Sequence, residues 1–290
     1  MKFKTAIEIP KYPFQIGLDD PLLLIGSCFS DYIGDFLNRG GFQALNNPFG
    51  TLFNPISIAS DLQLALHPEK FTSEWIYQHQ QQWLSFAHST KFSSEDYNSF
   101  IQNIKNQLHN THNALLKAHY LFVTFGTAFY YLFKEKNIIV ANCHKISAVA
   151  FEKKRVEIEQ VVERYTTLFH DIDTLNPELK IIFTVSPVRH LSDGFHENQV
   201  SKSILHLIVE QLVDHQKYFY FPSYEILNDD LRDYRFYGAD LVHPTSIAIE
   251  YISEIFRESF FSLHTIEKVK LFEKEAKSRL HINQKLTKNP

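Results

Sequence analysis

Five short apolar segments, separated by stretches with helical patterns, limit the folds open to this chain. They lack the polar alternation of a sheet with one wet face, so each is predicted to be a strand covered on both faces. Strands that alternate with helices favour a doubly wound α/β fold, a three-layer α/β/α sandwich around a five-stranded parallel sheet. The five segments are Leu22–Ile25, Phe42–Leu45, Tyr120–Phe125, Ile181–Val185 and Tyr218–Phe221.

Capping residues mark where the helices between these strands begin and end. Ser30 is expected to cap a helix that stops at Gly40-Gly41, and Asn54-Pro55 opens a helix over Ile56–Leu66. Further helices are predicted from Ser93 or Ser94 to about Ala118, over 152–169, over 197–216 and after Pro244. In the 197–216 helix one apolar face is expected to pack in the core, formed by Val200, Ile204, Leu207, Ile208 and Leu212.

Two segments interrupt the alternation of strands and helices. Residues 71–92 have no clear periodicity, and residues 129–143 resemble a hairpin of Phe129–Phe133 and Ile138–Ala141. Both are interpreted as insertions that cover a cleft. The charged tail, 264–290, is predicted to be a surface helix that frays near Pro290. With no repeat and no low-complexity linker, the chain is predicted to form a single domain over 1–290, with its core at about 20–260.

Composition excludes several classes of partner. The 29 basic and 33 acidic residues give a net charge of −4, which offers no electrostatic basis for binding nucleic acid or an anionic membrane. The first ten residues lack the apolar core of a signal peptide, and no apolar stretch approaches the roughly 20 residues that span a bilayer. Two cysteines cannot form a disulfide framework. These features predict a cytoplasmic protein.

The segment Gly26-Ser27-Cys28 joins a predicted buried strand to a predicted helix. The glycine permits a sharp turn, and the helix N-terminus offers N–H groups and a positive dipole end that stabilise a thiolate or an oxyanion. Either Ser27 or Cys28 is therefore a candidate nucleophile. The alternative is that small residues simply pack well at a strand–helix junction.

A second candidate element lies near the C-terminus, at Asp240-Leu-Val-His243. An aspartate three residues before a histidine can orient the imidazole, which then acts as general base toward a serine or cysteine. The alternative is a capping aspartate beside an exposed histidine. Together with the earlier turn, the order nucleophile, Asp, His is fairly specific.

Taken together, the motifs resemble those of the GSCFA domain family over about residues 20–260. They comprise Gly26-Ser27-Cys28-Phe29-Ser30, Asn47-Pro-Phe-Gly50-Thr with Phe53-Asn54-Pro55, Gly126-Thr127-Ala128, Asn142-Cys143-His144-Lys145 and Ser186-Pro187-Val188-Arg189-His190. The family is grouped with the SGNH (GDSL-like) hydrolase superfamily. That resemblance implies a flavodoxin-like fold and ester-hydrolysing or acyl-transferring chemistry, without naming a substrate.

The superfamily's first block, Gly-Asp-Ser, carries the nucleophilic serine. A gapless alignment places Cys28 at the nucleophile position, while a shift by one residue places Ser27 there; the register slightly favours Cys28. The second block implies that the backbone of Gly50 contributes to the oxyanion hole, with an ordinary turn glycine as the alternative. Asp240 and His243 match the final block without a gap.

The third block, Gly-x-Asn, is incomplete. Ala128 stands where the superfamily has an asparagine whose side chain donates to the oxyanion. Losing one such donor typically costs about 10²–10³-fold in rate. Asn142 is the proposed substitute, and Thr127 is the fallback.

Arg189 and His190 follow a predicted strand at its carboxyl end, so they are candidates for substrate binding; a salt-bridged pair at the rim is the alternative. No cofactor is implied, and cysteine spacing argues against zinc. The first hypothesis is an esterase-type hydrolase with a Ser/Cys-His-Asp triad, acting on a small-molecule or carbohydrate ester. An acyltransferase with the same residues and a non-catalytic ligand-binding module are the alternatives.

Overall fold

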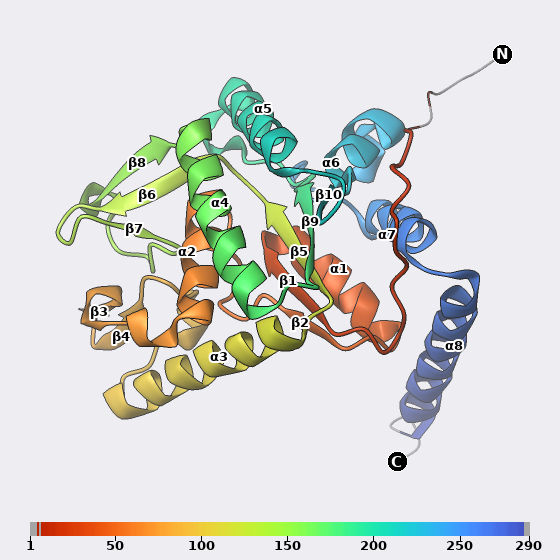
Figure 1. Cartoon of the computed structure of the whole chain (residues 1–290), viewed down its shortest axis with the longest axis horizontal. Coiled ribbons are helices and arrows are strands. Elements are labelled where there is room, and N and C mark those ends of the chain that lie inside the picture. Colours follow the sequence, from red (N-terminus) through yellow and green to blue (C-terminus); the bar gives the residue numbers. More distant parts are fainter. Residues whose placement is uncertain (1–4, 6, 287–290) are drawn as a thin grey trace.

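The computed structural model describes residue 5 and residues 7–286, with side chains described up to residue 274. Its centre is a five-stranded parallel sheet in the order β10-β9-β5-β1-β2 (Figure 1). Counted along the chain, these strands give the order 2-1-3-4-5 of flavodoxin-like folds. All five predicted strands are confirmed, as β1 Leu22–Gly26, β2 Ala44–Asn46, β5 Tyr120–Phe125, β9 Lys180–Val185 and β10 Tyr218–Tyr220.

Helices cover both faces of the sheet, which confirms the predicted three-layer architecture. Alternate strand residues point to opposite faces, so Leu23 packs with the helices of one layer and Leu24 with those of the other. The first layer contains α2 Pro55–Leu66, α3 Tyr97–Lys117, α4 Ile158–Leu175 and α5 Phe195–Leu212. The second contains α1 Cys28–Arg39 and α7 Ser246–Phe260.

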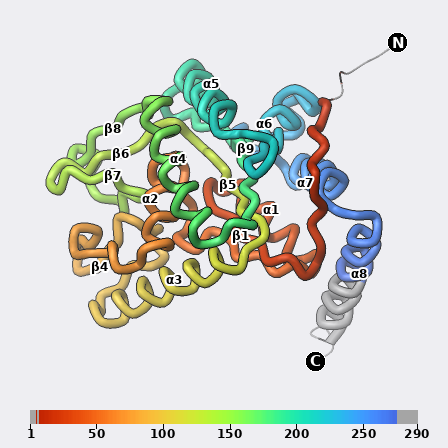
Figure 2. The backbone as a smooth tube through the Cα atoms, viewed as in Figure 1, coloured from red at the N-terminus to blue at the C-terminus, as the bar shows by residue number. Residues whose placement is uncertain are grey.

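Described segments near both ends of the chain pack against the second layer, through Tyr12 and Phe14 on one side and Ile266 and Val269 on the other. Figure 2 shows the N-terminal segment running beside α7, where the N–H of Ile16 donates to the Phe260 carbonyl at 2.7 Å. The last helix, α8 Leu263–Leu286, follows α7 as expected for the charged tail. Fraying near Pro290 concerns positions outside the described residues. The single-domain organisation stays a prediction.

The two interrupting segments form small sheets. Residues 71–92 contain the hairpin of β3 Ile76–His79 and β4 Gln82–Ser85. The predicted hairpin of 129–143 is confirmed as β6 Phe129–Phe133 and β7 Ile138–Val140. A third strand, β8 Phe151–Arg155, pairs with β6. The prediction of a helix over 152–169 was therefore wrong at its start, because those first residues complete a sheet.

Other helix boundaries also differ from prediction. Ser27, not Ser30, caps α1, while the Ser30 hydroxyl donates to Thr124 at 2.8 Å in the core. Asp96 caps α3 in place of Ser93 or Ser94, since its side chain accepts from the Ser99 N–H. Asn54 caps α2 as predicted, and Gly40 ends α1. Competing polar side chains a few residues apart explain these shifts, because any of them can cap a helix.

Candidate active site

The turn from β1 to α1 lies at the carboxyl edge of the sheet, between β5 and β2. Gly26 adopts φ +140°, and its N–H donates to the Asn47 side chain at 2.8 Å. Ser27 is fully buried; its N–H donates to the Thr124 carbonyl at 3.1 Å, and its hydroxyl accepts from the Phe29 N–H at 3.3 Å. In an open α/β sheet, ligands bind at the carboxyl edge where the strand order reverses, which here is between β1 and β5.

Gly26→Ala is expected to lower the free energy of unfolding by about 3 kcal/mol or more, because φ is positive and an added Cβ would lie 2.2 Å from the Thr124 carbonyl oxygen. Urea denaturation would measure the change. The matched control is Gly17→Ala, whose added Cβ meets its nearest atom at 3.5 Å. Equal stability of the two variants would contradict the argument.

Cys28 is the first residue of α1 and is partly exposed. Burial raises the pKa of its thiol, and the nearby carboxylate of Asp31 raises it further. Lys202 and the backbone N–H groups of Cys28 and Phe29 oppose this rise. Desolvation therefore outweighs the N–H groups at the helix N-terminus, which favours a resting thiol over a thiolate.

A polar network holds the Asn47–Gly50 turn beneath α1. Asp31 accepts from the side chains of Asn47 at 2.8 Å and Asn46 at 3.0 Å. The N–H of Gly50, whose φ is +84°, donates to the Asn47 carbonyl at 2.8 Å. That N–H is already bonded within the turn. Contrary to the expectation, this conformation does not offer it to an oxyanion.

Asp240 and His243 lie in the loop between β10 and α7. The Nδ1 of His243 lies 2.7 Å from Asp240 Oδ2, while Asp240 Oδ1 accepts from the N–H groups of Val242 at 2.9 Å and His243 at 3.0 Å. These hydrogen bonds lower the pKa of Asp240 to about 2, and the bond from the Val242 N–H contributes most. A carboxylate held by its own loop in this way keeps its charge and orients the imidazole.

Electrostatic contacts connect this loop with the Cys28 turn. Burial raises the pKa of Tyr32, and the charges of Cys28 and Asp240 raise it further, so Tyr32 lies within electrostatic range of both. The N–H of Arg189, in the loop after β9, donates to the Val242 carbonyl at 3.3 Å, which joins that loop to the Asp240–His243 loop. The predicted nucleophile turn and the predicted base therefore share one edge of the sheet.

Arg189 and His190 differ in what they offer a substrate. The Arg189 guanidinium packs over the ring of Tyr237, 4.0 Å from its centroid. The pKa of His190 is lowered to about 4 by burial and by the charges of Lys202 and His243, so its imidazole is neutral at neutral pH. Its Nε2 is buried without a hydrogen-bond partner among the described residues. His190 thus has a donor or acceptor free for a ligand, whereas Arg189 is already stacked.

The hydrogen bonds of Ala128, Thr127 and Asn142 bear on the oxyanion donor that is missing after β5. The N–H of Ala128 donates to the Ser201 hydroxyl at 2.7 Å, and Thr127 Oγ1 lies 3.2 Å from the same hydroxyl. The Oδ1 of Asn142 accepts from the His144 N–H at 2.8 Å, which leaves Nδ2 as its donor group. The Thr127 hydroxyl is therefore engaged by Ser201 of α5 and by the Phe129 N–H, and Asn142 retains the more suitable donor.

A cavity of about 260 Å³ lies beside these groups. Its polar lining includes Thr127, Asn142 and His190, and β6 contributes aromatic rings of Phe129 and Tyr131. The small sheet of β6, β7 and β8 thus supplies one wall of this pocket.

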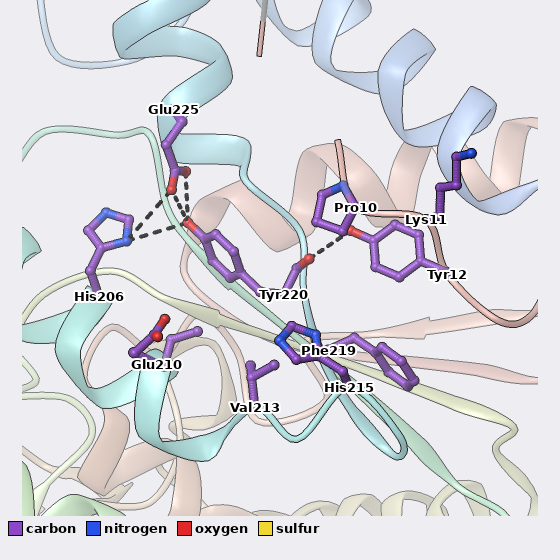
Figure 3. Close-up of a pocket in the computed structure, with 11 residues that line it drawn as sticks. Pro10, Lys11, Tyr12, His206, Glu210, Val213, His215, Phe219, Tyr220 and Glu225 are labelled. Atoms are coloured by element: carbon purple, nitrogen blue, oxygen red, sulfur yellow. Dashed lines mark hydrogen bonds and ion pairs between the residues drawn. The ribbon is translucent and has the colours of Figure 1, made fainter. Parts of the chain in front are cut away.

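A second pocket, of about 300 Å³, lies on the β10 side of the molecule (Figure 3). There the Tyr220 hydroxyl donates to both Glu225 oxygens, at 2.7 and 2.9 Å, and Tyr12 donates to the Tyr220 carbonyl. Neither Cys28 nor His243 lines this pocket or the 260 Å³ cavity, but only the smaller cavity includes the candidate residues Thr127, Asn142 and His190.

The residue that sequence reasoning missed is Lys202, on α5. The predicted apolar face of that helix is partly wrong, because Leu207 is 52% exposed and Lys202 is only 1% exposed. The buried face also carries Asn198 and Ser201. No periodic signal marks a lysine that reaches the sheet edge from within a helix.

The sequence model of the GSCFA family matches residues 21–256. The chain belongs to the GSCFA family. This confirms the resemblance drawn from its motifs. No curated protein matches the chain.

Two solved structures similar to this chain are esterases. A catalytic mutant of an acetylxylan esterase from Geobacillus stearothermophilus has 13% identity and a TM-score of 0.40, over 86% of this chain and 98% of that one. A carbohydrate esterase family 3 protein from Talaromyces cellulolyticus has 9% identity and a TM-score of 0.37, over 86% and 97%. Similarity at this level carries no conclusion about the activity of this GSCFA protein.

Two features are absent from the residues that the structure describes. They contain no group of three or more His, Cys, Asp or Glu side chains arranged to hold a metal ion. No helix in the described part of the chain is long and apolar enough to cross a membrane.

Proposed function

We propose that this GSCFA protein is an esterase-type hydrolase that acts on a small acyl ester, including esters of carbohydrates, with Cys28 as nucleophile. The observation that carries the proposal is the Asp240–His243 pair, 2.7 Å apart, at the sheet edge that also holds the Cys28 turn. Cys28 is preferred over Ser27 because it is partly exposed, whereas Ser27 is fully buried and caps α1.

The proposed reaction begins with His243. Because Asp240 accepts at Nδ1, the neutral imidazole carries its proton there and presents Nε2 as the base. Nε2 takes the thiol proton of Cys28, and Sγ attacks the ester carbonyl carbon. The tetrahedral intermediate collapses to a thioester on Cys28 while His243 returns the proton to the leaving alcohol. Water, deprotonated by His243, then hydrolyses the thioester.

The oxyanion of the intermediate needs donors at the same edge. The N–H of Cys28 lies at the N-terminus of α1, where helix geometry leaves it without an intrahelical acceptor. The Nδ2 of Asn142 is the proposed second donor, and Thr127 is the fallback. Gly50 would contribute only if its turn released the N–H that now bonds to Asn47. The cavity beside Asn142 would hold part of the substrate, with the neutral His190 as a hydrogen-bonding partner.

Wild-type protein incubated with p-nitrophenyl acetate is expected to release p-nitrophenol continuously and, after acid quenching, to carry an acetyl group on the peptide that contains Cys28. Mass spectrometry locates the group, and its loss in neutral hydroxylamine identifies a thioester, since an acetyl ester on Ser27 is more resistant. Transfer of the acetyl group to an added alcohol in preference to water would show that the protein is an acyltransferase and not a hydrolase. No turnover of any p-nitrophenyl ester in an acyl-length series, with no acylated peptide, would favour the ligand-binding module and contradict the proposal.

A further inference from the structure

Lys202 is a buried amine that the proposed mechanism does not use. Its side chain extends from α5 into the interior and is 1% exposed. Nζ donates to the Gly126 carbonyl and to the Ser186 carbonyl, each at 2.7 Å. Lysines are almost never fully buried unless paired, because desolvating the charge is costly. Within the described part of the chain, no carboxylate lies within salt-bridge distance of this ammonium.

The two carbonyls place the ammonium beside the nucleophile turn. Gly126 directly follows β5, which pairs with β1, and Ser186 directly follows β9, which pairs with β5 on its other side. Gly126 packs closely on the turn, since a Cβ added there would lie 3.2 Å from the Cβ of Ser27. Two of the three N–H donors of an ammonium are used by the carbonyls, so the charge is held in place and is only partly satisfied.

Lys202 and Cys28 interact in both directions. Lys202 lowers the pKa of Cys28, and Cys28 opposes the burial that lowers the pKa of Lys202 to about 7. Other titratable groups also face the pair. Asp31 acts on Cys28 and disfavours the thiolate. His190 and His206 face Lys202, whose charge adds to the lowering of their pKa values by burial. With a pKa of about 7, the Lys202 amine is close to half protonated at neutral pH, and a thiolate on Cys28 favours its charged form.

We propose that Lys202 is the charge partner of Cys28, a positioning residue whose ammonium, fixed by the Gly126 and Ser186 carbonyls, stabilises the thiolate at the N-terminus of α1. In the reaction, His243 takes the proton from Sγ, and the electron pair left on sulfur is the charge that Lys202 faces. The mechanistic part rests on the proposed function; the effect on the thiol does not. A cation here would also offset Asp31, whose carboxylate lies on the same helix.

The test measures alkylation of Cys28 by iodoacetamide as a function of pH, without any ester substrate. Cys143→Ala removes the other cysteine of the chain and serves as the reference background. Adding Lys202→Met, similar in length but neutral, is expected to move the apparent pKa of Cys28 up by about one unit, an approximately tenfold slower alkylation at neutral pH. Lys202→Arg, which keeps the charge, is expected to restore most of the rate. Leu205→Met, at another buried position of α5, is the matched control and should leave the profile in place.

The outcomes separate the two proposals. A Lys202→Met protein that is folded, by thermal melting, and alkylates like the reference would overturn the charge partnership even if the esterase is active. If Lys202→Met does not fold, Lys202→Gln, which keeps a donor for one carbonyl, replaces it and must show the same slowing. A shifted alkylation profile in a protein that hydrolyses no ester would support the Lys202–Cys28 pair and contradict the proposed function alone.

Discussion

Cys28→Ala is expected to reduce hydrolysis of p-nitrophenyl acetate by at least about 10³-fold, because the covalent route loses its nucleophile. Cys28 is the exposed member of the Ser27-Cys28 pair and the first residue of α1, where helix geometry leaves its N–H free for the oxyanion. Alanine keeps that backbone, so the loss should appear in kcat rather than in folding. Steady-state kinetics and a thermal melt of the same preparation would measure both.

Ser27→Ala is the matched control for this prediction. The Ser27 hydroxyl caps α1 by accepting from the Phe29 N–H, so its removal should cost about 1 kcal/mol of stability. Activity should remain within about tenfold of the wild type, a far smaller loss than the general range for a missing nucleophile. The reverse pattern, with Ser27→Ala inactive and Cys28→Ala active, would move the nucleophile to Ser27.

His243→Ala is expected to lower kcat by about 10²–10⁴-fold, the range for loss of a positioned general base. The loss should be large here because burial raises the pKa of Cys28, so the thiol does not ionise readily without a base. Raising the pH supplies thiolate directly; the variant should therefore recover part of its activity in alkaline buffer, whereas Cys28→Ala should not. A pH profile of kcat for both variants measures this difference.

An exposed histidine provides the control for His243. His109 lies on α3, in the helix layer on the other side of the sheet from α1, and His109→Ala should match the wild type. Asp240, with its pKa lowered to about 2, stays ionised throughout the range in which activity can be measured, so its protonation should not shape the profile. Full activity in His243→Ala at neutral pH would exclude the proposed Cys-His-Asp triad.

Much of the fold could be predicted because the relevant signals are local. Apolar runs that remain apolar on both faces marked all five strands of the sheet, and the Asn54-Pro55 cap marked the start of α2. Errors occurred where local signals compete. The Phe151–Arg155 segment has helix-forming residues, yet it completes a sheet with β6, because an edge strand finds its hydrogen bonds in a partner distant in sequence.

In the candidate site, too, local features could be predicted from the sequence and features that depend on packing could not. The sequence alone determined the Asp240–His243 pair, since residues three apart in one loop can meet without help from the rest of the chain. Only the tertiary structure decided the state of three other groups. Ser27 is buried, and the N–H of Gly50 is bonded within its own turn. Lys202 reaches the Gly126 carbonyl beside the Ser27-Cys28 turn. Burial and hydrogen-bond partners depend on which elements pack together, and a lysine in α5 meets Gly126 and Ser186 only after α5 has packed on the sheet.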